Sequence, residues 1–340
     1  MPCRLRRRWL LRVSDGIDGP LLGSKGAPQL THGELRMRTE TAVPAENWRR
    51  LGKAPDPYLQ RIRDVVYQVA GIFQSDENLP FLEECARKRM QAVDANSLRQ
   101  YYDRLTVRRD REAELHRLVG EMNLGETCFF RNPLQLEALR RVVLPAICQD
   151  KNRPPCHHVR VWSAGCATGE EPYSLAMSLM EAMEAEETLQ EWTFEVLATD
   201  WNNGFLEKAK EGIYSLHALR HVPPSLQQKR FRPCRDQFQV TDEVKAMVSF
   251  HPLNLLEEHS VSWAKDMDAI FCCNVLIHFD GSPQRRTIQR FHDSLLPNGY
   301  LFVGNSESLY GVSDNFRLVH FPGSTAYRKV CLQSPAAGVI

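Results

Sequence analysis

The chain has 340 residues, of which 25% are charged and 43% are hydrophobic, and its formal net charge is +1. This composition is typical of globular proteins and argues against disordered and fibrous classes. The length allows one sizeable core and a smaller companion domain. Because the net charge is close to zero, no strong overall field would attract a phosphate backbone, and we expect no nucleic-acid partner.

The ten cysteines are scattered, without a Cys-x-x-Cys pair of zinc spacing. The run Cys156–His158 looks like a ligand cluster, but adjacent side chains rarely converge on one ion, so we predict no metal site. No apolar stretch approaches the roughly 20 residues of a membrane span. The basic opening segment breaks at Arg12 and Ser14, too early for a signal-peptide core. We therefore expect a soluble, cytoplasmic protein without membrane insertion.

The first part of the chain changes from irregular to helical. Residues 1–54 are rich in Arg, Gly and Pro and lack periodicity, which predicts a flexible tail. From Asp56 onward, apolar residues recur at three-and-four spacing, the pattern of an amphipathic helix: Leu59, Ile62, Val65, Val66, Val69 and Ile72. Three more helices are predicted over 81–90, 97–105 and 112–122. The sequence therefore predicts a small all-helical domain over 55–124.

Beyond a predicted helix at 133–147, short apolar runs alternate with helical patterns. The predicted strands are Val159–Trp162, Phe194–Ala198, Val248–Pro252, Ala269–Cys273 and Tyr300–Val303, followed by an antiparallel pair, Phe316–His320 and Ala326–Val330. Such alternation is typical of an α/β domain with a mostly parallel sheet and helices on both faces. We predict this domain over 125–331, a small β-subdomain inserted at 214–247, and a tail at 332–340.

The strongest local motif runs from Val159 to Met177, where a strand enters a glycine-containing turn before a helix near Glu170. Gly165 and Gly169 permit positive φ and close approach of a ligand. Their spacing differs from the dinucleotide fingerprint. Carboxylates at the helix start repel phosphate but suit a ligand with ammonium and sulfonium charges, which favours S-adenosyl-L-methionine over NAD. The alternative is an ordinary strand-to-helix turn.

Polar residues follow later strands. Asp200 ends the second strand, where a carboxylate can accept both ribose hydroxyls of a nucleoside; its alternative role is a helix N-cap for 202–210. Asn254 and Asn274 can bond an adenine edge or the amino-acid part of the cofactor. For each of these amides, capping of a loop is an equally weighted alternative.

The segment Gly125–Asn132 joins the two predicted domains. Arg131 can present a cation to the cofactor carboxylate, or it can be solvated. For Phe129 and Phe130 we favour hydrophobic packing over a role in the pocket.

Taken together, several long motifs resemble the CheR-type methyltransferases that esterify glutamates of chemoreceptors. The resemblance covers residues 56–329, and its carriers are ETCFFRN, RVWSAGCATGEEPYSLAM, LATDWNNGFLEKAKEGIYS, NLLEE, DAIFCCNVLIHFD and LPNGYLFVGNSES. It implies a helical domain, a Rossmann-like S-adenosyl-L-methionine-dependent methyltransferase domain and a small inserted β-subdomain. It further implies that the partners are helical segments of chemoreceptor cytoplasmic regions.

The resemblance also implies roles for individual residues. Thr127 and Arg131 would reach the cofactor, Glu170 its amino-acid part and Asp200 its ribose. The pairs Asn254–Leu255 and Cys273–Asn274 would line the rest of the site.

Three positions depart from the family pattern. Gly125 replaces an Asn, Cys273 replaces an Arg, and His278 replaces a Tyr. The loss of the Arg removes a charged contact, and the His places a titratable ring beside the expected substrate carboxylate. These changes bear on turnover and substrate choice more than on cofactor binding.

Methyl transfer to a carboxylate requires no general base, because glutamate is already ionised at neutral pH. His278 is therefore predicted to position the acceptor carboxylate, with a core or helix-start histidine as an equal alternative. The arginines at 99–111 can meet an acidic partner, although we favour a solvated charged face. Two further hypotheses are a cofactor-binding sensor without catalysis and a methyltransferase for another acceptor, and a nicotinamide enzyme ranks third. We predict a monomer.

Overall fold

The computed structural model describes residues 56–122, 127–151, 157–257 and 263–330. The predicted tails at 1–54 and 332–340, together with Gly125 and Cys156, lie outside the described residues. Within the described ranges, no helix combines the length and apolar character that a bilayer crossing requires. The same residues contain no group of three or more His, Cys, Asp or Glu side chains placed to hold a metal ion.

The N-terminal part consists of helices. Their bounds are α2 Pro57–Ala70, η1 Asp76–Asn78, α3 Leu79–Ala92, α4 Leu98–Thr106 and α5 Arg111–Glu121. The apolar face predicted for the first helix is buried, with Leu59, Ile62 and Val66 fully inaccessible to solvent. Ser97 caps α4 by accepting a hydrogen bond from the Gln100 backbone N–H at 3.2 Å.

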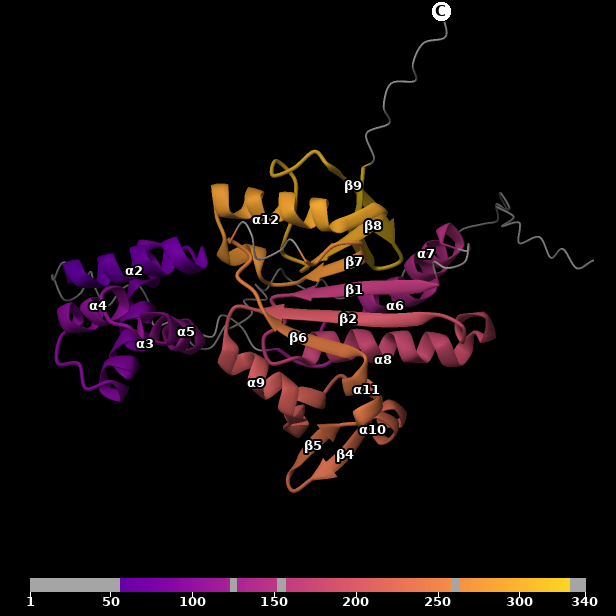
Figure 1. Cartoon of the computed structure of the whole chain (residues 1–340), viewed down its shortest axis with the longest axis horizontal. Helices are drawn as coiled ribbons and strands as arrows, with labels where there is room; N and C mark the ends of the chain where they lie inside the picture. Colours follow the sequence, from indigo (N-terminus) through magenta and orange to yellow (C-terminus); the bar gives the residue numbers. More distant parts are fainter. Residues whose placement is uncertain (1–55, 123–126, 152–156, 258–262, 331–340) are drawn as a thin grey trace, which may run out of the picture. The chain divides into compact units, whose positions relative to one another are not determined.

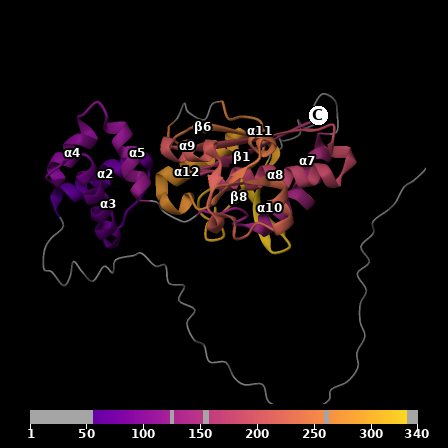
Figure 2. The same cartoon turned by 90° about the horizontal axis from the view of Figure 1, so that it is seen from below.

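The C-terminal part contains a seven-stranded sheet of order β6-β2-β1-β7-β8-β10-β9 (Figure 1, with a turned view in Figure 2). The strands are β1 His158–Ala164, β2 Thr193–Asp200, β6 Val248–Pro252, β7 Met267–Cys272, β8 Leu295–Val303, β9 Phe316–Phe321 and β10 Ser324–Lys329. The first five in the order are parallel, and β10 pairs antiparallel with both of its neighbours, β8 and β9. The predicted α/β class and the closing antiparallel pair are therefore confirmed.

The largest difference from the predicted strand bounds is at β8, which begins five residues earlier than predicted. β8 begins at Leu295, which pairs with Met267 on β7, and the pairing resumes at Tyr300 after a register shift. The intervening Asn298 has a φ of 65°, so the Pro-Asn-Gly sequence forms an irregularity inside the strand. Because Pro-Asn-Gly is typical of a turn, the sequence predicted that the strand begins only at Tyr300. The predicted strand therefore corresponds to the second, regularly paired part of β8.

Two apolar layers cover the faces of the sheet. Alternate residues of one strand point to opposite faces, so Val161 of β1 packs on the side of α8 (Glu170–Ala185), whereas Trp162 packs on the side of α12 (Gly281–Ser294). On the first side lies the helical stretch α6 Pro133–Ala138, the π-helical turn η2 Leu139–Val143 and α7 Leu144–Asp150. The single helix predicted over 133–147 thus carries a π-turn and extends to Asp150.

The insert after β2 forms its own small sheet. It follows α9 Asn203–Glu211 and comprises β3 Ile213–Tyr214, η4 Leu216–Leu219, α10 Pro224–Arg230, β4 Phe231–Cys234, β5 Gln237–Val240 and α11 Asp242–Ala246. The three strands pair antiparallel in the order β3-β5-β4. Phe129 packs edge-on against Tyr214 and Phe231, with ring centroids 4.8 and 5.0 Å apart, so the aromatic residue before the sheet domain has the packing role that we favoured.

Candidate active site

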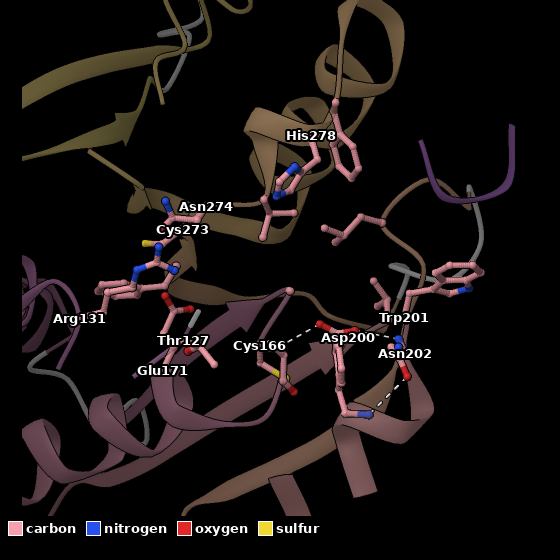
Figure 3. A pocket seen from close by; sticks show the side chains of 18 of the residues that line it. Thr127, Arg131, Cys166, Glu171, Asp200, Trp201, Asn202, Cys273, Asn274 and His278 are labelled. Carbon is pink, nitrogen blue, oxygen red and sulfur yellow. Dashed lines mark hydrogen bonds between the residues drawn. The ribbon is translucent and has the colours of Figure 1, made fainter. Parts of the chain in front are cut away.

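A cavity of about 220 Å³ lies at the carboxyl ends of β1, β2 and β7 (Figure 3). Its volume far exceeds the ~10–15 Å³ that one water molecule needs, so the cavity has room for a ligand. The structure brings nine of the predicted site residues to its walls: Thr127, Arg131, Gly165, Asp200, Asn254, Leu255, Cys273, Asn274 and His278. Parallel strands present their carboxyl ends at one edge, and this is why residues far apart in sequence meet here.

The glycine turn forms one wall. Gly165 has a φ of 78°, and a Cβ added there would meet Val275 Cγ2 at 2.5 Å. Only glycine therefore fits between the turn and the opposite wall. Gly169 has a φ of 97°, but its neighbours are Ala209 and the Tyr214 hydroxyl. Gly169 does not line the cavity, so its contribution is to shape the turn before α8.

The two carboxylates at the start of α8 have different surroundings. Glu170 accepts a hydrogen bond from Thr168 Oγ1 at 2.7 Å and is not among the lining residues, so its contact with the ligand stays a prediction. Glu171 lines the cavity instead and accepts a hydrogen bond from Ser163 Oγ at 2.8 Å. Adjacent helical residues point about 100° apart, so the motif identified the acidic pair but not its inward member.

Burial controls the charge of Glu171. Desolvation raises the pKa of its carboxyl to about 7, although the Ser163 and Cys273 side chains and the Arg131 charge oppose this rise. A nearby cation would favour the ionised form. A positively charged ligand group near Glu171 would therefore stabilise its ionised carboxylate.

Asp200 occupies the centre of the glycine-turn side (Figure 3). Its Oδ2 accepts from the Ala167 backbone N–H at 2.9 Å, and its Oδ1 accepts from the Asn202 N–H at 2.7 Å. Burial nevertheless raises the pKa of the Asp200 carboxyl to about 6. The N-cap of α9 is Asn202, whose side chain accepts from Gly204 N–H at 2.9 Å, so the capping alternative for Asp200 is wrong. A carboxylate offers about four acceptor sites, which leaves two for ligand hydroxyls.

The two predicted asparagines differ. Asn254 Oδ1 accepts from the Leu256 backbone N–H at 3.0 Å, which is the loop-capping alternative, although the residue also lines the cavity. Asn274 adopts a φ of 62°, and its backbone N–H donates to Glu307 Oε2 at 2.8 Å. This geometry leaves the Asn274 side chain to the cavity wall.

Arg131 is the only Lys or Arg among the cavity-lining residues of the described chain. Its guanidinium lies beside Cys273 and Glu171 (Figure 3). The Cys273 thiol donates to Gln135 Oε1 at 3.6 Å, and Gln135 Nε2 donates to the Val303 carbonyl at 2.7 Å. Gln135 and Glu171 were not among the individually predicted site residues. This end of the cavity therefore combines one cation and one acid.

His278 ends the short helix η5 (Leu276–His278) and is half-buried. Desolvation lowers the pKa of its imidazole, opposed by a hydrogen bond with the Asn274 backbone. The lowered pKa favours the neutral ring at pH 7, and the single N–H of a neutral imidazole is the donor in the bond with the Asn274 backbone.

These groups fit S-adenosyl-L-methionine. Asp200 suits ribose hydroxyls, and the Glu171–Arg131 end suits an ammonium and a carboxylate. Trp201, Phe205 and Leu255 also line the cavity and supply apolar surface near Asp200 for a base.

Comparison with known proteins gives the family. The model described as the all-alpha domain of CheR methyltransferases matches residues 57–122, and the model described as their SAM binding domain matches residues 125–324. Chemotaxis protein methyltransferase 2 of Vibrio cholerae is 34% identical over 270 residues, covering 79% of this chain and 91% of the relative. The Salmonella typhimurium chemotaxis protein methyltransferase is 31% identical, covering 85% and 95%. The Borreliella burgdorferi chemotaxis protein methyltransferase is 31% identical, covering 74% and 88%.

The matches join both parts of the chain to one family. The helices before residue 122 and the sheet domain with its cavity each match their own family model. The predicted resemblance, the methyltransferase fold and the cofactor are thereby confirmed. The chain belongs to the CheR family of S-adenosyl-L-methionine-dependent methyltransferases.

Proposed function

We propose that this protein transfers the methyl group of S-adenosyl-L-methionine to glutamate side chains on cytoplasmic helical segments of chemoreceptors, forming methyl esters. The observation that carries the proposal is the convergence of Arg131, Glu171 and Asp200 on one cavity with the neutral His278. Family membership and relatives named chemotaxis protein methyltransferases support the acceptor class.

The residue roles follow from charge and position. Asp200 accepts the ribose hydroxyls, Glu171 binds the ammonium, and Arg131 binds the carboxylate with help from the neighbouring Thr127. The predicted adenine and amino-acid contacts fall to Leu255, Asn274 and Cys273, whereas Asn254 stabilises the loop. Gly169 and Glu170 act indirectly, by holding the turn that presents Gly165.

The bound cofactor supplies an electrophilic methyl group on a positively charged sulfur. The protein must strip water from the acceptor carboxylate and hold its oxygen in line with that methyl. Such positioning can lower a barrier by roughly 7–11 kcal/mol in favourable cases. No general base is required, because a glutamate side chain is ionised at neutral pH. His278, on the cavity wall, positions the acceptor carboxylate.

The remaining predictions describe the whole chain. We retain the division into a tail at 1–54, a helical domain at 55–124, a methyltransferase domain at 125–331 with an insert at 214–247, and a tail at 332–340. We also retain a cytoplasmic location and a monomeric state. Size-exclusion chromatography with light scattering tests the last of these.

The test is transfer of a labelled methyl group from S-adenosyl-L-methionine to chemoreceptor-containing membranes, followed by mild base. The proposal expects label on the receptor and its release as methanol, since carboxyl methyl esters are base-labile. Receptors whose acceptor glutamates are replaced by alanine are the matched control and should stay unlabelled. Label that resists base, or that appears equally on the control receptors, would contradict the proposal and favour another acceptor.

A further inference from the structure

Glu307 links two segments at the edge of the cavity. It follows β8, is half-buried, and accepts three backbone N–H groups. Its Oε2 accepts from Gly304 at 2.6 Å and from Asn274 at 2.8 Å, and its Oε1 accepts from Ile277 at 3.0 Å. Two of these donors belong to the segment after β7, more than 25 residues earlier in the chain.

The segment 273–278 depends on this carboxylate because little regular structure holds it. Asn274 has a φ of 62°, a conformation that most residues avoid. Only the short helix η5 follows, with backbone bonds from His278 to Val275 and from Phe279 to Leu276. Hydrogen bonds from backbone N–H to a carboxylate are roughly twice as strong as neutral ones.

The segment also packs tightly against its surroundings. A Cβ at Gly304 would meet Glu307 Oε2 at 2.8 Å and the Asn274 backbone nitrogen at 3.0 Å. On the other side, Val275 reaches to within 2.5 Å of the position of a Cβ at Gly165. Because the interior is close-packed, a shift of this segment would change the cavity width.

We propose that Glu307 is a positioning residue for methyl transfer, whose carboxylate fixes segment 273–278 so that Asn274 and His278 face the bound cofactor and acceptor. This inference rests on the proposed function of the cavity. Glu307 itself is not among the cavity-lining residues, so it acts through the segment that it holds.

The number of acceptors predicts the order of variant effects. A carboxylate satisfies all three donors, whereas the single amide oxygen of Glu307→Gln satisfies two and turns an NH₂ toward the third. Glu307→Ala satisfies none. We therefore expect Glu307→Ala to have the larger effect and Glu307→Gln an intermediate one.

The experiment compares Glu307→Ala and Glu307→Gln with Glu181→Gln. Glu181 lies on α8, pairs with Arg140 at 3.0 Å, and does not line the cavity. Calorimetry gives the Kd for S-adenosyl-L-methionine, methyl transfer gives kcat, and thermal unfolding gives Tm. We expect Glu307→Ala to raise the Kd for S-adenosyl-L-methionine about tenfold and to lower kcat about tenfold or more. Glu181→Gln should change the Kd and kcat less than about twofold.

A double-mutant cycle separates positioning from general destabilisation. If Glu307 acts through Asn274, Glu307→Ala should change the Kd less than about twofold in an Asn274→Ala background. Fully additive effects, or an unchanged Kd and kcat in Glu307→Ala, would overturn the inference. If Glu307→Ala does not fold, Glu307→Gln decides by the same two readouts. Should the wild type bind the cofactor but label no receptor, the proposed acceptor fails while the Kd cycle still tests Glu307.

Discussion

The cavity has two opposite walls that are built differently. The glycine-turn wall consists of residues 165–167, Glu171 and Asp200, and it carries two carboxylates whose pKa values burial raises. The β7 wall, residues 273–278, carries neutral side chains and is held by the Glu307 carboxylate from another strand end. The carboxylates of the glycine-turn wall are therefore stabilised most by a positively charged ligand, whereas the β7 wall orients the cofactor and the acceptor.

This difference assigns separate tasks. Ionising a buried carboxyl costs free energy that a bound cation can offset, so the glycine-turn wall should determine cofactor affinity. On the β7 wall, the backbone N–H groups of Asn274 and Ile277 are satisfied by Glu307, which fixes this segment. The β7 wall should therefore determine how the methyl group and the acceptor align, in addition to contacting the cofactor. Mutations in the glycine-turn wall are expected to change mainly the cofactor Kd, whereas mutations that disturb the β7 wall are expected to change both Kd and kcat.

The largest expected effect comes from Arg131, which lies between the walls. Arg131→Ala removes the only Lys or Arg among the described lining residues and should lower kcat/KM about 100-fold, in line with the loss of a charge pair. Arg131→Lys keeps the charge without the planar fork and should recover part of the loss. Arg140→Ala, which breaks a surface ion pair with Glu181, is the control and should be close to wild type. Equal activities for the two alanine variants would remove Arg131 from the site.

Asp200 tests the glycine-turn wall. Asp200→Ala should weaken cofactor binding by about 1–3 kcal/mol, the usual cost of leaving buried hydroxyls without an acceptor. Asp268→Asn is the matched control, because Asp268 is also buried and accepts from a backbone N–H, that of Arg160 at 2.9 Å, but lies at the start of β7. If calorimetry shows the same cofactor affinity for Asp200→Ala as for the wild type, Asp200 does not contact the ribose.

The pH dependence of cofactor binding tests the raised pKa values. Burial raises the pKa of Glu171 to about 7 and that of Asp200 to about 6, above the unfolded values near 4. The ligand-free protein should thus lose stability as pH rises from about 4 to 7, because its folded state resists ionisation. The cofactor prefers both groups ionised, so its affinity should rise over the same range and level off above pH 7.

We expect affinity at pH 5.5 to be about tenfold or more below that at pH 8. Glu171→Gln should flatten the upper part of the curve, whereas Glu170→Gln should leave it unchanged because Glu170 faces Thr168. A flat wild-type profile, or flattening only in Glu170→Gln, would reverse our assignment of the inward carboxylate.

The smallest effect is expected at His278 on the β7 wall. The family pattern has a Tyr at this position, and its hydroxyl can donate a hydrogen bond to a carboxylate, so His278→Tyr should keep turnover within about threefold or raise it. His278→Phe lacks a donor and should lower kcat with little change in cofactor Kd. Complete loss of activity in His278→Tyr would instead show that the imidazole has a role of its own.

The two walls also differ in how far their residues could be predicted from the sequence. The turn from β1 to α8 and the end of β2 are contiguous motifs, so Gly165 and Asp200 were identified from spacing. The choice between Glu170 and Glu171 depends on helix phase against Ser163, which lies in the preceding strand. Glu307 was not identified, because its donors are distant in sequence and its role exists only once β7 and β8 are paired. Site residues within contiguous motifs could be predicted from the sequence, whereas hydrogen bonds between the ends of different strands could not.

The measurement that tests the central claim most directly is the position of the transferred methyl group. A chemoreceptor cytoplasmic fragment is incubated with S-adenosyl-L-methionine and either wild type or Asp200→Ala, at a cofactor concentration below the wild-type Kd, and mapped by tandem mass spectrometry. We predict one added methyl on glutamate side chains with wild type and much less with Asp200→Ala. A methyl group on other residue types, or equal labelling by both proteins, would contradict the proposed reaction or the proposed site.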